Sequence, residues 1–360
     1  MPKKVVVGMS GGVDSSVTAY LLKQQGYEVI GVTMQIWQDE DREEIEENGG
    51  CCGLSAVDDA RRVAASIGIP HYVLNFKQEF KEKVIDYFID EYLNGATPNP
   101  CIACNRYVKW ESMLSKALAI GADYIATGHY AKITKHPETD RYTLALSDTD
   151  SKDQTYALYN LTQYQLEHTL MPLGSYEKSE IRKIAANIGL NVANKPDSQD
   201  ICFVPDGNYA GFISQNTRRQ IIPGDFTDIN GKVLGRHKGI CHYTVGQRKG
   251  LGIAFGVPMY VCGIDLNKNT VILGGSHELF KKDVLIRDFN WMAFEKQKNN
   301  TTLKVMGKLR YSQKMSPCTI TVADNMVVCQ FDEPQRAVTP GQAAVFYSDG
   351  YVIGGGVIVR

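Results

Sequence analysis

Gly8-Met9-Ser10-Gly11-Gly12-Val13-Asp14-Ser15-Ser16 decides the fold, because it follows the β-branched run Val5-Val6-Val7 and opens a helical pattern over residues 14–23. Its glycines let the backbone turn tightly and bring N–H groups close to an anion. The N-terminus of the following helix adds a partial positive charge, and the serine hydroxyls add hydrogen-bond donors. The stretch therefore predicts a phosphate-binding turn between a buried strand and a helix.

The sequence of this turn separates it from other phosphate-binding turns. It lacks the lysine of the Walker A pattern Gly-x-x-x-x-Gly-Lys-Ser/Thr, which argues against a kinase or a GTPase. Ser-Gly-Gly-x-Asp-Ser resembles instead the pyrophosphate loop of enzymes that cleave ATP between the α and β phosphates to adenylate a substrate. The resemblance implies an adenine nucleotide alpha hydrolase-like fold, Asp14 as a candidate Mg²⁺ ligand, and ATP binding by Gly8, Met9, Ser10, Gly11, Gly12, Val13, Asp14 and Ser15.

Up to about residue 190, strand-length apolar runs alternate with helical patterns. Strands are expected at 5–7, 29–32, 71–74 and 124–126, and helices at 14–23, 56–67, 80–93 and 107–119. This alternation predicts a Rossmann-like parallel α/β sheet. Ligands of such sheets bind beyond the carboxyl ends of the strands. Met34 and Gly128 follow two of these strands, and the resemblance implies that they touch the adenosine; taken alone they would be a core and a turn residue.

Beyond about residue 205 the pattern changes to glycine-punctuated, strand-length runs, at 257–264, 270–273, 318–322 and 350–359. This texture predicts a β-rich second half, made of a small β module followed by a β-barrel. We expect three domains: an ATP-binding domain over 1–205, a β-rich domain over 206–280 and a barrel over 281–360.

Composition restricts the class of protein. The 360 residues are 43% apolar and 22% charged, as in globular proteins of several domains. Because we find no apolar run long enough for a membrane span or a signal peptide, we expect a cytoplasmic protein without a membrane partner. The nine cysteines then favour thiol or metal chemistry over structural disulfides. A net charge of −1 means that any RNA surface depends on local clustering.

Two cysteines stand in unusual surroundings. Cys104 ends the proline-stiffened stretch 97–104, close to the expected start of a helix, where a thiol has a depressed pKa. Cys202 stands in Asp197-Ser198-Gln199-Asp200-Ile201-Cys202-Phe203. Thr-Pro-Asn-Pro-x-x-x-Cys-Asn and Asp-Ser-Gln-Asp-x-Cys-Phe, together with the pyrophosphate loop, resemble the tRNA-specific 2-thiouridylases, and the resemblance extends over the whole chain.

This resemblance implies a transferase that uses ATP to replace the C2 oxygen of the wobble uridine, position 34 of the tRNAs for lysine, glutamate and glutamine, with sulfur. Adenylation converts the unreactive C2 oxygen into a leaving group. Cys202 would carry a persulfide received from a protein sulfur donor, a cysteine desulfurase or a relay protein. Attack of the Cys104 thiolate on Cys202 would free the product sulfur and leave a disulfide. Alternatively, Cys104 releases hydrosulfide, which acts as the nucleophile.

The chain departs from the family pattern at Cys101, where many members have aspartate. With Cys104 and Cys202 nearby, three thiolates could hold a [4Fe–4S] cluster that carries the sulfur. Zinc is less favoured, since a structural zinc site normally has four ligands. The role of Cys51-Cys52 stays open, and we expect inert core thiols at Cys241, Cys262, Cys318 and Cys329.

Two long stretches, 229–264 and 296–323, contain lysine and arginine but no acidic residue. By composition alone they could be ordinary solvated faces or a surface that binds a phosphate backbone. The resemblance favours the second interpretation and implies that 206–280 is a tRNA-binding domain. The resemblance implies that Thr97, Pro98 and Asn99 meet the target base, splayed out of the anticodon loop. It also implies tRNA contacts at His129, Lys152, Asp153, Gln154, Arg310, Tyr311 and Gln342, although His129 could equally be a buried, hydrogen-bonded histidine.

Two other classes of protein remain to be weighed. Amide-forming ligases share the pyrophosphate loop, but their nucleophile is nitrogen and they leave the two cysteines unexplained. An ATP-regulated RNA-binding or iron–sulfur sensor protein leaves the carbonyl-activating loop without a role.

Overall fold

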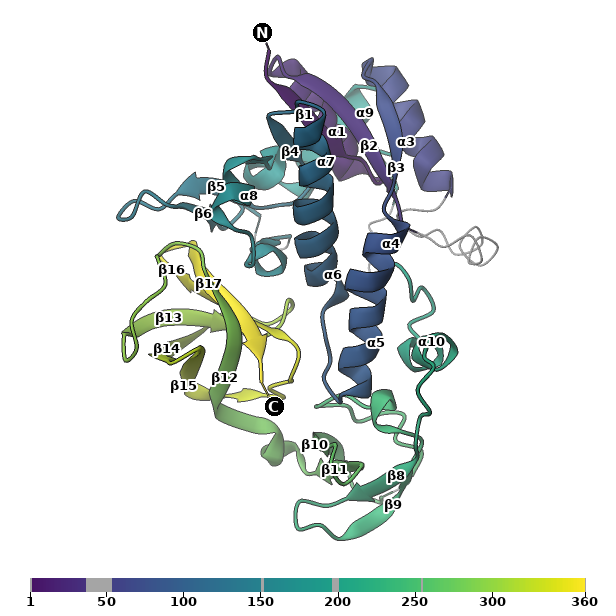
Figure 1. Ribbon diagram of the computed structural model, residues 1–360, viewed down its shortest axis with the longest axis vertical. Helices are drawn as coiled ribbons and strands as arrows, with labels where there is room; N and C mark the ends of the chain where they lie inside the picture. Colours follow the sequence, from purple (N-terminus) through teal and green to yellow (C-terminus); the bar gives the residue numbers. More distant parts are fainter. Residues whose placement is uncertain (1, 37–53, 150–151, 196–200, 254, 360) are drawn as a thin grey trace.

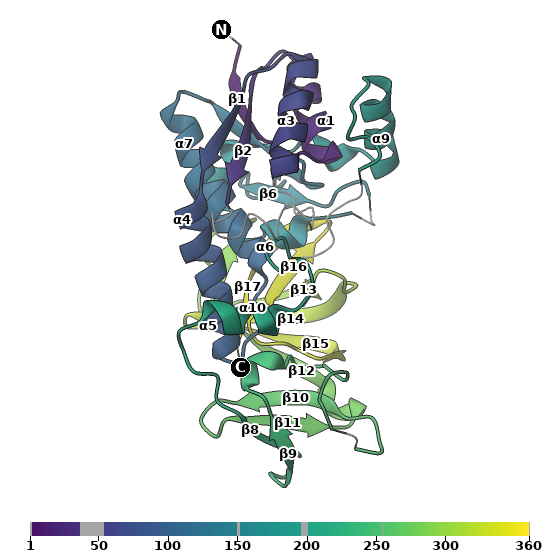
Figure 2. The same cartoon turned by 90° about the vertical axis from the view of Figure 1, so that its right-hand side faces the viewer.

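The computed structural model describes residues 2–36, 54–149, 152–195, 201–253 and 255–359 (Figure 1). Cys51-Cys52 and residues 197–200 of the Cys202 motif lie outside the described residues. The parallel α/β sheet lies at one end of the long axis and a four-stranded sheet at the other. The barrel lies between them, beside two long helices (Figures 1 and 2).

The N-terminal sheet confirms the predicted Rossmann-like arrangement. Its strand order is β3-β2-β1-β4-β7, and every neighbouring pair is parallel. Val5 and Val7 face one side of β1 and Val6 faces the other, as expected for a strand buried on both faces. The strands are β1 (Lys4–Gly8), β2 (Glu28–Gln35), β3 (His71–Asn75), β4 (Tyr124–Ala126) and the unpredicted β7 (Thr169–Leu170).

Helices cover both faces of this sheet. One face is covered by α1 (Val13–Gln24), α3 (Leu54–Ile67) and α9 (Lys178–Asn187). Two long helical stretches cover the other face and lie side by side (Figure 1). The first comprises α4 (Lys77–Phe80), the π-helical η2 (Lys81–Ile85) and α5 (Asp86–Leu93). The second comprises α6 (Pro100–Ala103), the π-helical η3 (Cys104–Met113) and α7 (Leu114–Ala119).

The second long helix begins at Pro100 and not at Tyr107 as the sequence predicted. Asn99 occupies the N-cap position, where its side-chain oxygen accepts hydrogen bonds from the N–H groups of Cys101 at 3.1 Å and Ile102 at 3.3 Å. Pro100 takes the first helical position, where its fixed φ favours the helix. The expected loop is thus confined to residues 97–99, and the rest of the proline-containing stretch is already helical.

The β-rich second half is confirmed as two separate sheets. After α10 (Tyr209–Asn216), a small sheet in the order β10-β11-β8-β9 packs around Phe226, Val261 and Leu273. Its strands are β8 (Gly224–Thr227), β9 (Val233–His237), β10 (Tyr260–Asp265) and β11 (Thr270–Gly274). Short helices complete the chain: η4 (Thr155–Leu158), α8 (Gln163–Glu167), η5 (Pro172–Ser175), η6 (Ile240–His242) and η7 (Ser276–Leu279).

The last strands form a closed barrel in the order β12-β15-β14-β13-β16-β17, and pairing of β12 with β17 closes it. A hairpin from the first half of the chain extends the barrel sheet through the pairing of Tyr351 with Ala145. This hairpin comprises β5 (Lys132–Lys135) and β6 (Tyr142–Ala145). The barrel strands are β12 (Phe280–Trp291), β13 (Thr302–Lys308), β14 (Ser316–Ala323), β15 (Met326–Arg336), β16 (Ala343–Ser348) and β17 (Tyr351–Ile358).

The barrel is further held to the α/β part by side-chain to backbone hydrogen bonds. Asn290 of β12 donates to the carbonyls of Tyr159 and Leu161, and Tyr156 donates its hydroxyl to the carbonyl of Ala343. The expected domain limits at 205 and 280 stay predictions. Two strands from before residue 205, β5 and β6, belong to the barrel sheet. Within the described part of the chain, none of the helices combines the length and apolar character needed to span a membrane.

Candidate active site

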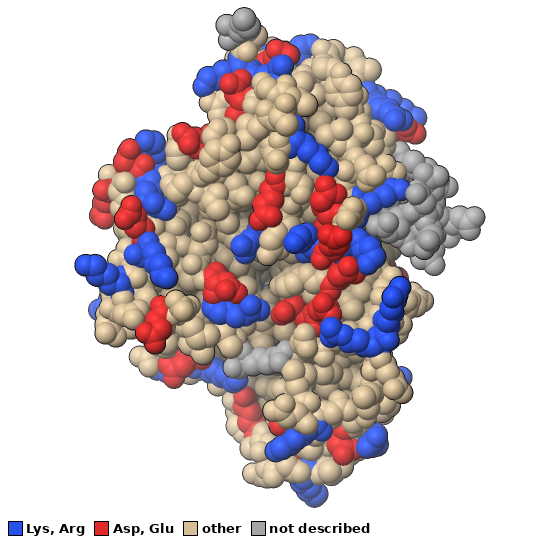
Figure 3. Space-filling view, viewed as in Figure 1, with Lys and Arg blue, Asp and Glu red and all other residues tan. Residues whose placement is uncertain are grey.

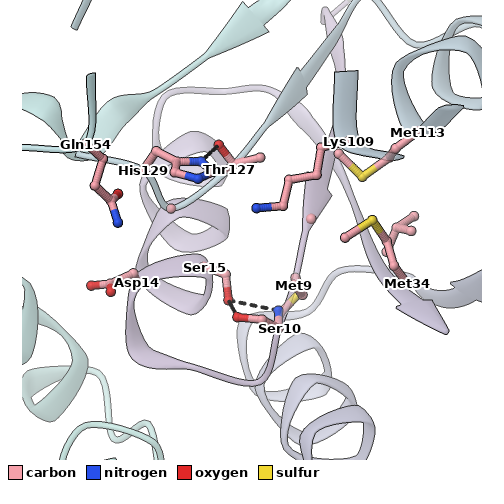
Figure 4. Close-up of a pocket in the computed structure, with 13 residues that line it drawn as sticks. Met9, Ser10, Asp14, Ser15, Met34, Lys109, Met113, Thr127, His129 and Gln154 are labelled. Atoms are coloured by element: carbon pink, nitrogen blue, oxygen red, sulfur yellow. Dashed lines mark hydrogen bonds between the residues drawn. The ribbon is translucent and has the colours of Figure 1, made fainter. Parts of the chain in front are cut away.

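A cavity of about 180 Å³ opens at the carboxyl ends of β1 and β4 (Figure 4). These two strands are neighbours, but the chain leaves β1 toward β2 and β4 toward β7, on opposite sides of the sheet. Such a switch point is where open α/β sheets bind their ligands. The cavity is lined by Gly8, Met9, Ser10, Asp14, Ser15, Val32, Met34, Lys109, Met113, Thr127, Gly128, His129 and Gln154.

The Ser-Gly-Gly turn forms one wall of this cavity. The backbone N–H of Ser10 donates to Ser15 Oγ at 3.2 Å, and the two hydroxyl oxygens lie 3.4 Å apart. Gly12 occupies the N-cap position of α1 without a side chain to cap the first-turn N–H groups. Gly11 has φ +68°, and a Cβ there would lie 2.3 Å from the carbonyl oxygen of Ala56. The turn therefore needs glycine at position 11, and its uncapped N–H groups can donate hydrogen bonds to a bound anion.

Gly128 brings the end of β4 against the N-terminus of α1. A Cβ at this position would lie 2.8 Å from both the carbonyl carbon of Asp14 and the amide nitrogen of Ser15, so a larger residue would push the two elements apart. Met34, at the end of β2, lines the cavity together with Met113 of η3. The structure thus brings the two expected adenosine contacts to the same cavity as the Ser-Gly-Gly turn.

The carboxylate of Asp14 is already engaged within the protein. Lys178 of α9 donates to both of its oxygens, at 2.8 and 2.7 Å, and the hydroxyl of Tyr130 donates to Oδ1 at 2.7 Å. The Lys178 side chain is only 14% exposed, so the ion pair is largely shielded from solvent. A Mg²⁺ ion on Asp14 would have to displace Lys178, and the site as built does not fit an Asp14-bound metal.

Lys109 and His129 form the opposite wall, and Lys109 was missed by sequence reasoning. Lys109 Nζ donates to Asn105 Oδ1 at 2.8 Å, and Asn105 Nδ2 donates to the carbonyl of Ala157 at 3.1 Å. His129 Nδ1 lies 2.7 Å from the hydroxyl of Thr127. Burial, and then the Lys109 charge, lower the pKa of His129 well below its ordinary value, so the ring is neutral near pH 7.

The two candidate sulfur-carrying segments meet the same pair of long helices. Cys104 and Cys202 are both half-buried and pack against the same hydrophobic core. Phe203 contacts Phe80 and Phe88, with ring centroids 5.8 and 5.3 Å apart. Because α4, which ends at Phe80, packs against η3, which begins at Cys104, both segments lie at this helix pair.

The helix start at Pro100 changes the electrostatic argument for Cys104. The field of a helix N-terminus acts mainly within the first turn. That turn contains Cys101, which is exposed, whereas Cys104 lies one turn further on. The expected helix-dipole activation therefore applies to Cys101 more than to Cys104.

Lys195 connects the segment that leads to Cys202 with the nucleotide turn. Its ammonium donates to the carbonyl of Gly11 at 3.2 Å and to Asp59 Oδ2 of α3 at 2.8 Å. Arg182 of α9 holds the backbone carbonyls of Ala193 and Lys195. Lys195 therefore contacts the Ser-Gly-Gly turn, and Phe203, further along the chain, contacts the first long helix.

The expected target-base segment, which belongs to the first part of the chain, is held by both of the other parts. Gln342 Nε2 donates to the carbonyl of Thr97 at 2.7 Å, and Thr97 N donates to the carbonyl of Pro340 at 2.8 Å. The hydroxyl of Thr97 lies 3.3 Å from that of Thr244, which belongs to the middle part of the chain. Gln342, expected to contact tRNA, thus contacts the backbone of the target-base segment.

Other expected tRNA contacts lie near the cavity, at the joint between η4 and the barrel. Gln154 lines the cavity and accepts the N–H of Tyr130 at 2.9 Å. Asp153 accepts the N–H groups of Ser147 and Thr155, at 2.9 and 3.2 Å, which shapes the turn around the half-buried Lys152. Asp153 also acts on Tyr311 of the barrel, whose pKa is raised by burial and then by the Asp153 charge.

Arg310 and Tyr311 differ in their exposure to a partner. The half-buried Arg310 donates to the carbonyls of Arg336 and Ala337. Tyr311 is 43% exposed, and Lys308 Nζ lies 5.4 Å from its ring centroid. Tyr311 is therefore presented outward, with the half-buried Lys308 beside its ring, and an exposed aromatic ring of this kind can stack on bases.

Charge on the face seen in Figure 3 is mixed. Acidic and basic side chains are interspersed over the region of the long helices, outside the grey residues. These helices carry ion pairs such as Lys116–Glu79 and Lys81–Asp86, each 2.8 Å. The mixed charge of this face does not by itself mark it as a surface for a phosphate backbone.

The remaining described cysteines agree with a core role. Cys241, Cys318 and Cys329 are buried and Cys262 is half-buried. Burial raises the pKa of Cys241 and Cys262, and a hydrogen bond with Cys318 raises that of Cys329. Among the described residues, no three His, Cys, Asp or Glu side chains are grouped so that they could hold a metal ion.

Comparisons with known proteins account for the whole chain. Residues 3–206 match the tRNA methyl transferase HUP domain, 210–275 the tRNA methyl transferase PRC-barrel domain and 281–358 the aminomethyltransferase beta-barrel domain. The chain is 63% identical to the tRNA-specific 2-thiouridylase MnmA of Lachnoclostridium phytofermentans, over 99% of this chain and 100% of that protein. It is 59% identical to the MnmA of Clostridioides difficile, over 100% of this chain and 99% of that protein. The chain therefore belongs to the tRNA-specific 2-thiouridylase family of enzymes.

Proposed function

We propose that this protein uses ATP to convert the wobble uridine, position 34, of the tRNAs for lysine, glutamate and glutamine into 2-thiouridine. One observation carries the proposal. A single helix, from Pro100 to Ala119, bears Cys104 and also Lys109 and Met113 of the nucleotide cavity. Activation of an oxygen and delivery of sulfur would therefore occur at adjacent points of one rigid element.

The first step is activation of the C2 oxygen. The Ser-Gly-Gly turn would hold the β and γ phosphates of ATP, while Met34 and Gly128 lie where they would contact the adenosine. The O2 atom of uridine attacks the α-phosphorus, the bond to the β-bridging oxygen breaks, and pyrophosphate leaves. The product carries AMP on O2, which makes this oxygen a leaving group.

Sulfur transfer follows at the same carbon. A persulfide on Cys202, supplied by a protein sulfur donor, adds at C2 through its terminal sulfur, and AMP leaves. The Cys104 thiolate then attacks the Cys202 sulfur, which breaks the sulfur–sulfur bond to the substrate and leaves 2-thiouridine and a Cys104–Cys202 disulfide. A two-electron thiol reductant must restore both thiols. The shared core beneath Cys104 and Cys202 supports their meeting.

tRNA would bind across the joint between the α/β part and the barrel. The flipped base would face Thr97, Pro98 and Asn99. The tRNA nucleotide that approaches the cavity would contact His129 and Gln154. Lys152, Asp153, Arg310 and Tyr311 would contact the tRNA beside it. Asp153 and Tyr311 lie close enough for the Asp153 charge to raise the pKa of Tyr311. Gln342 would act through the target-base segment that it holds.

A [4Fe–4S] cluster is the second candidate for the sulfur carrier. Cys101 and Cys104 stand three residues apart in one helix, and positions i and i+3 share a helix face. A cluster would need Cys202 as its third thiolate, leaving a fourth iron to bind sulfide, but the structure does not group these three described cysteines as metal ligands.

The decisive experiment combines the purified protein with ATP, a lysine tRNA transcript and a protein persulfide donor. We expect pyrophosphate release that depends on the tRNA, together with 2-thiouridine detected by mass spectrometry of the digested tRNA. A transcript with cytidine at the wobble position is the matched control and should give neither signal. Pyrophosphate release with ammonia and a small acceptor, or a methylated nucleoside in place of the thiolated one, would contradict the proposal.

A further inference from the structure

Lys109 gives the nucleotide cavity a cation that no carboxylate of the described residues balances. Asp14 and Lys109 are the acid and the lysine that line it. Asp14 is neutralised by Lys178 from α9. In the described parts of the chain, no carboxylate lies within ion-pair distance of Lys109, whose Nζ donates to the neutral amide of Asn105. His129 does not share the positive charge, because burial keeps its ring neutral.

The position of this ammonium is fixed by the fold. Asn105 is only 3% exposed, and its Nδ2 donates a hydrogen bond to the carbonyl of Ala157, within η4. Asn105 and Lys109 lie on the same helix as Cys104. Figure 4 shows the Lys109 side chain reaching into the cavity, with Ser10 and Ser15 across from it and Met34 to one side. A cation held in this way is preorganised for an anion in the cavity.

The proposed function assigns two parts of ATP to this cavity. The β and γ phosphates would bind at the Ser-Gly-Gly turn, and the adenosine would bind beside Met34. The α-phosphate joins these two groups, so it must pass between them. Lys109 extends into that space from the opposite wall.

We propose that Lys109 is a catalytic residue that contacts the α-phosphoryl group of ATP and stabilises it during adenylation, and that Asn105 is its positioning residue. This inference rests on the proposed adenylation. Lys109 transfers no proton in this step: it donates a hydrogen bond to a non-bridging oxygen while O2 of uridine attacks and pyrophosphate leaves. A charge-assisted hydrogen bond of this kind strengthens as charge develops on the phosphoryl oxygens.

The test compares AMP with adenosine as ligands of the full-length protein. The two differ by the α-phosphate alone, so the contact should appear in their affinity ratio, measured by calorimetry without tRNA. In Lys109→Met we expect AMP affinity to fall about ten- to hundredfold, the range for a hydrogen bond to a charged group. Adenosine affinity should stay within about twofold, because the adenosine wall is unchanged.

Matched variants separate charge from packing. Lys109→Arg keeps the charge and should keep most of the preference for AMP. Lys116→Met removes a lysine from the same helical stretch, outside the cavity, and should leave both affinities unchanged. If Lys109→Met folds poorly by circular dichroism, Lys109→Gln serves instead, since its amide can still bond to Asn105. Equal losses for AMP and adenosine, or no loss for either, would overturn the inference.

Catalysis gives an independent readout. Lys109→Met should slow tRNA-dependent pyrophosphate release at saturating ATP, whereas Asn105→Ala should cause a smaller loss and no loss of charge. If the wild-type protein fails to thiolate tRNA, the proposed function fails. The AMP-to-adenosine ratio would still decide the Lys109 contact, so the two failures are distinguishable. Unchanged pyrophosphate release in Lys109→Met would remove Lys109 from adenylation.

Discussion

The side-chain amide of Gln342, in the loop before β16 of the barrel, donates a 2.7 Å hydrogen bond to the backbone carbonyl of Thr97, which lies 245 positions earlier in the sequence. The neighbouring Gly341 has φ +87°, and a Cβ there would lie 2.9 Å from Thr97 N. The barrel loop and the target-base segment are therefore in direct backbone contact. Movement of the barrel on binding tRNA would be passed to the segment that precedes Cys104.

Gln342→Ala should lower the rate of thiolation while leaving tRNA affinity within a few-fold of the parent. Loss of one side-chain hydrogen bond is expected to reduce the free energy of unfolding by about 1 kcal/mol. Single-turnover thiolation and a filter-binding assay separate the two effects. Gln330→Ala, which removes an exposed amide bonded to Asp283, is the matched control and should change neither. A large loss of tRNA affinity with normal single-turnover chemistry would instead make Gln342 a direct tRNA contact.

Cys104→Ser and Cys202→Ser should each abolish 2-thiouridine formation. Serine cannot carry a persulfide or form the disulfide, but it preserves the size of the side chain, so tRNA-dependent pyrophosphate release should persist. Mass spectrometry of the tRNA and a pyrophosphate assay read the two steps. Cys262→Ser, in the middle sheet, should retain both activities. If either active-site variant still thiolates tRNA, that cysteine has no place in the mechanism.

Cys101 distinguishes the two sulfur carriers. Under the persulfide mechanism, Cys101→Asp should remain active, because no step uses the Cys101 thiol. Under the cluster mechanism it should lose iron, sulfide and activity together, since the cluster would lose one of its three ligands. Protein purified without oxygen should be assayed for iron, sulfide and visible absorbance. An iron-free wild-type enzyme with full activity would exclude the cluster.

Much of the catalytic half could be predicted from sequence because its signals are local. Val5-Val6-Val7 and the run before Met34 are β-branched, as buried parallel strands are, and the Ser-Gly-Gly turn fixes the first crossover. β7 could not be predicted, because two residues carry no periodicity. The start of the helix at Pro100 was misplaced because prolines in the stretch suggested a loop, although Asn99 followed by Pro100 is a capping signal.

What sequence could not supply is pairing between distant segments. The β5–β6 hairpin reads as an ordinary part of the first domain, but the pairing of Ala145 with Tyr351 adds it to the barrel. Lys109 resembles any exposed lysine of an amphipathic helix until the fold directs it into the cavity. The available signal was weak: Asn105 and Lys109 are one turn apart, immediately after Cys104. Likewise, nothing local connects Lys178 with Asp14.

The ion pair of Asp14 and Lys178 should contribute measurably to stability. Lys178→Met leaves the Asp14 carboxylate with the Tyr130 hydroxyl alone, and we expect it to reduce the free energy of unfolding by about 1–3 kcal/mol. Asp14→Asn should also destabilise the protein, because it removes the carboxylate paired with the largely buried Lys178. Adding Asp14→Asn to Lys178→Met should cost little more. Strictly additive losses in this double-mutant cycle, measured by urea denaturation, would mean that the pair is not coupled.

The neutral His129 should make stability depend on pH. Its pKa is depressed by burial and then by Lys109, so the native state binds fewer protons than the unfolded state below the ordinary value of about 6.5. Stability is therefore complete above that pH and is lost as the pH falls toward the native pKa. His129→Gln removes this contribution, and the difference in unfolding free energy between variant and parent should change with pH only below about 6.5. His136→Gln is the control, because it removes another largely buried histidine outside the cavity. A difference that stays constant from neutral to acidic pH would show that His129 binds protons alike in the native and unfolded states, so that burial does not keep its ring neutral.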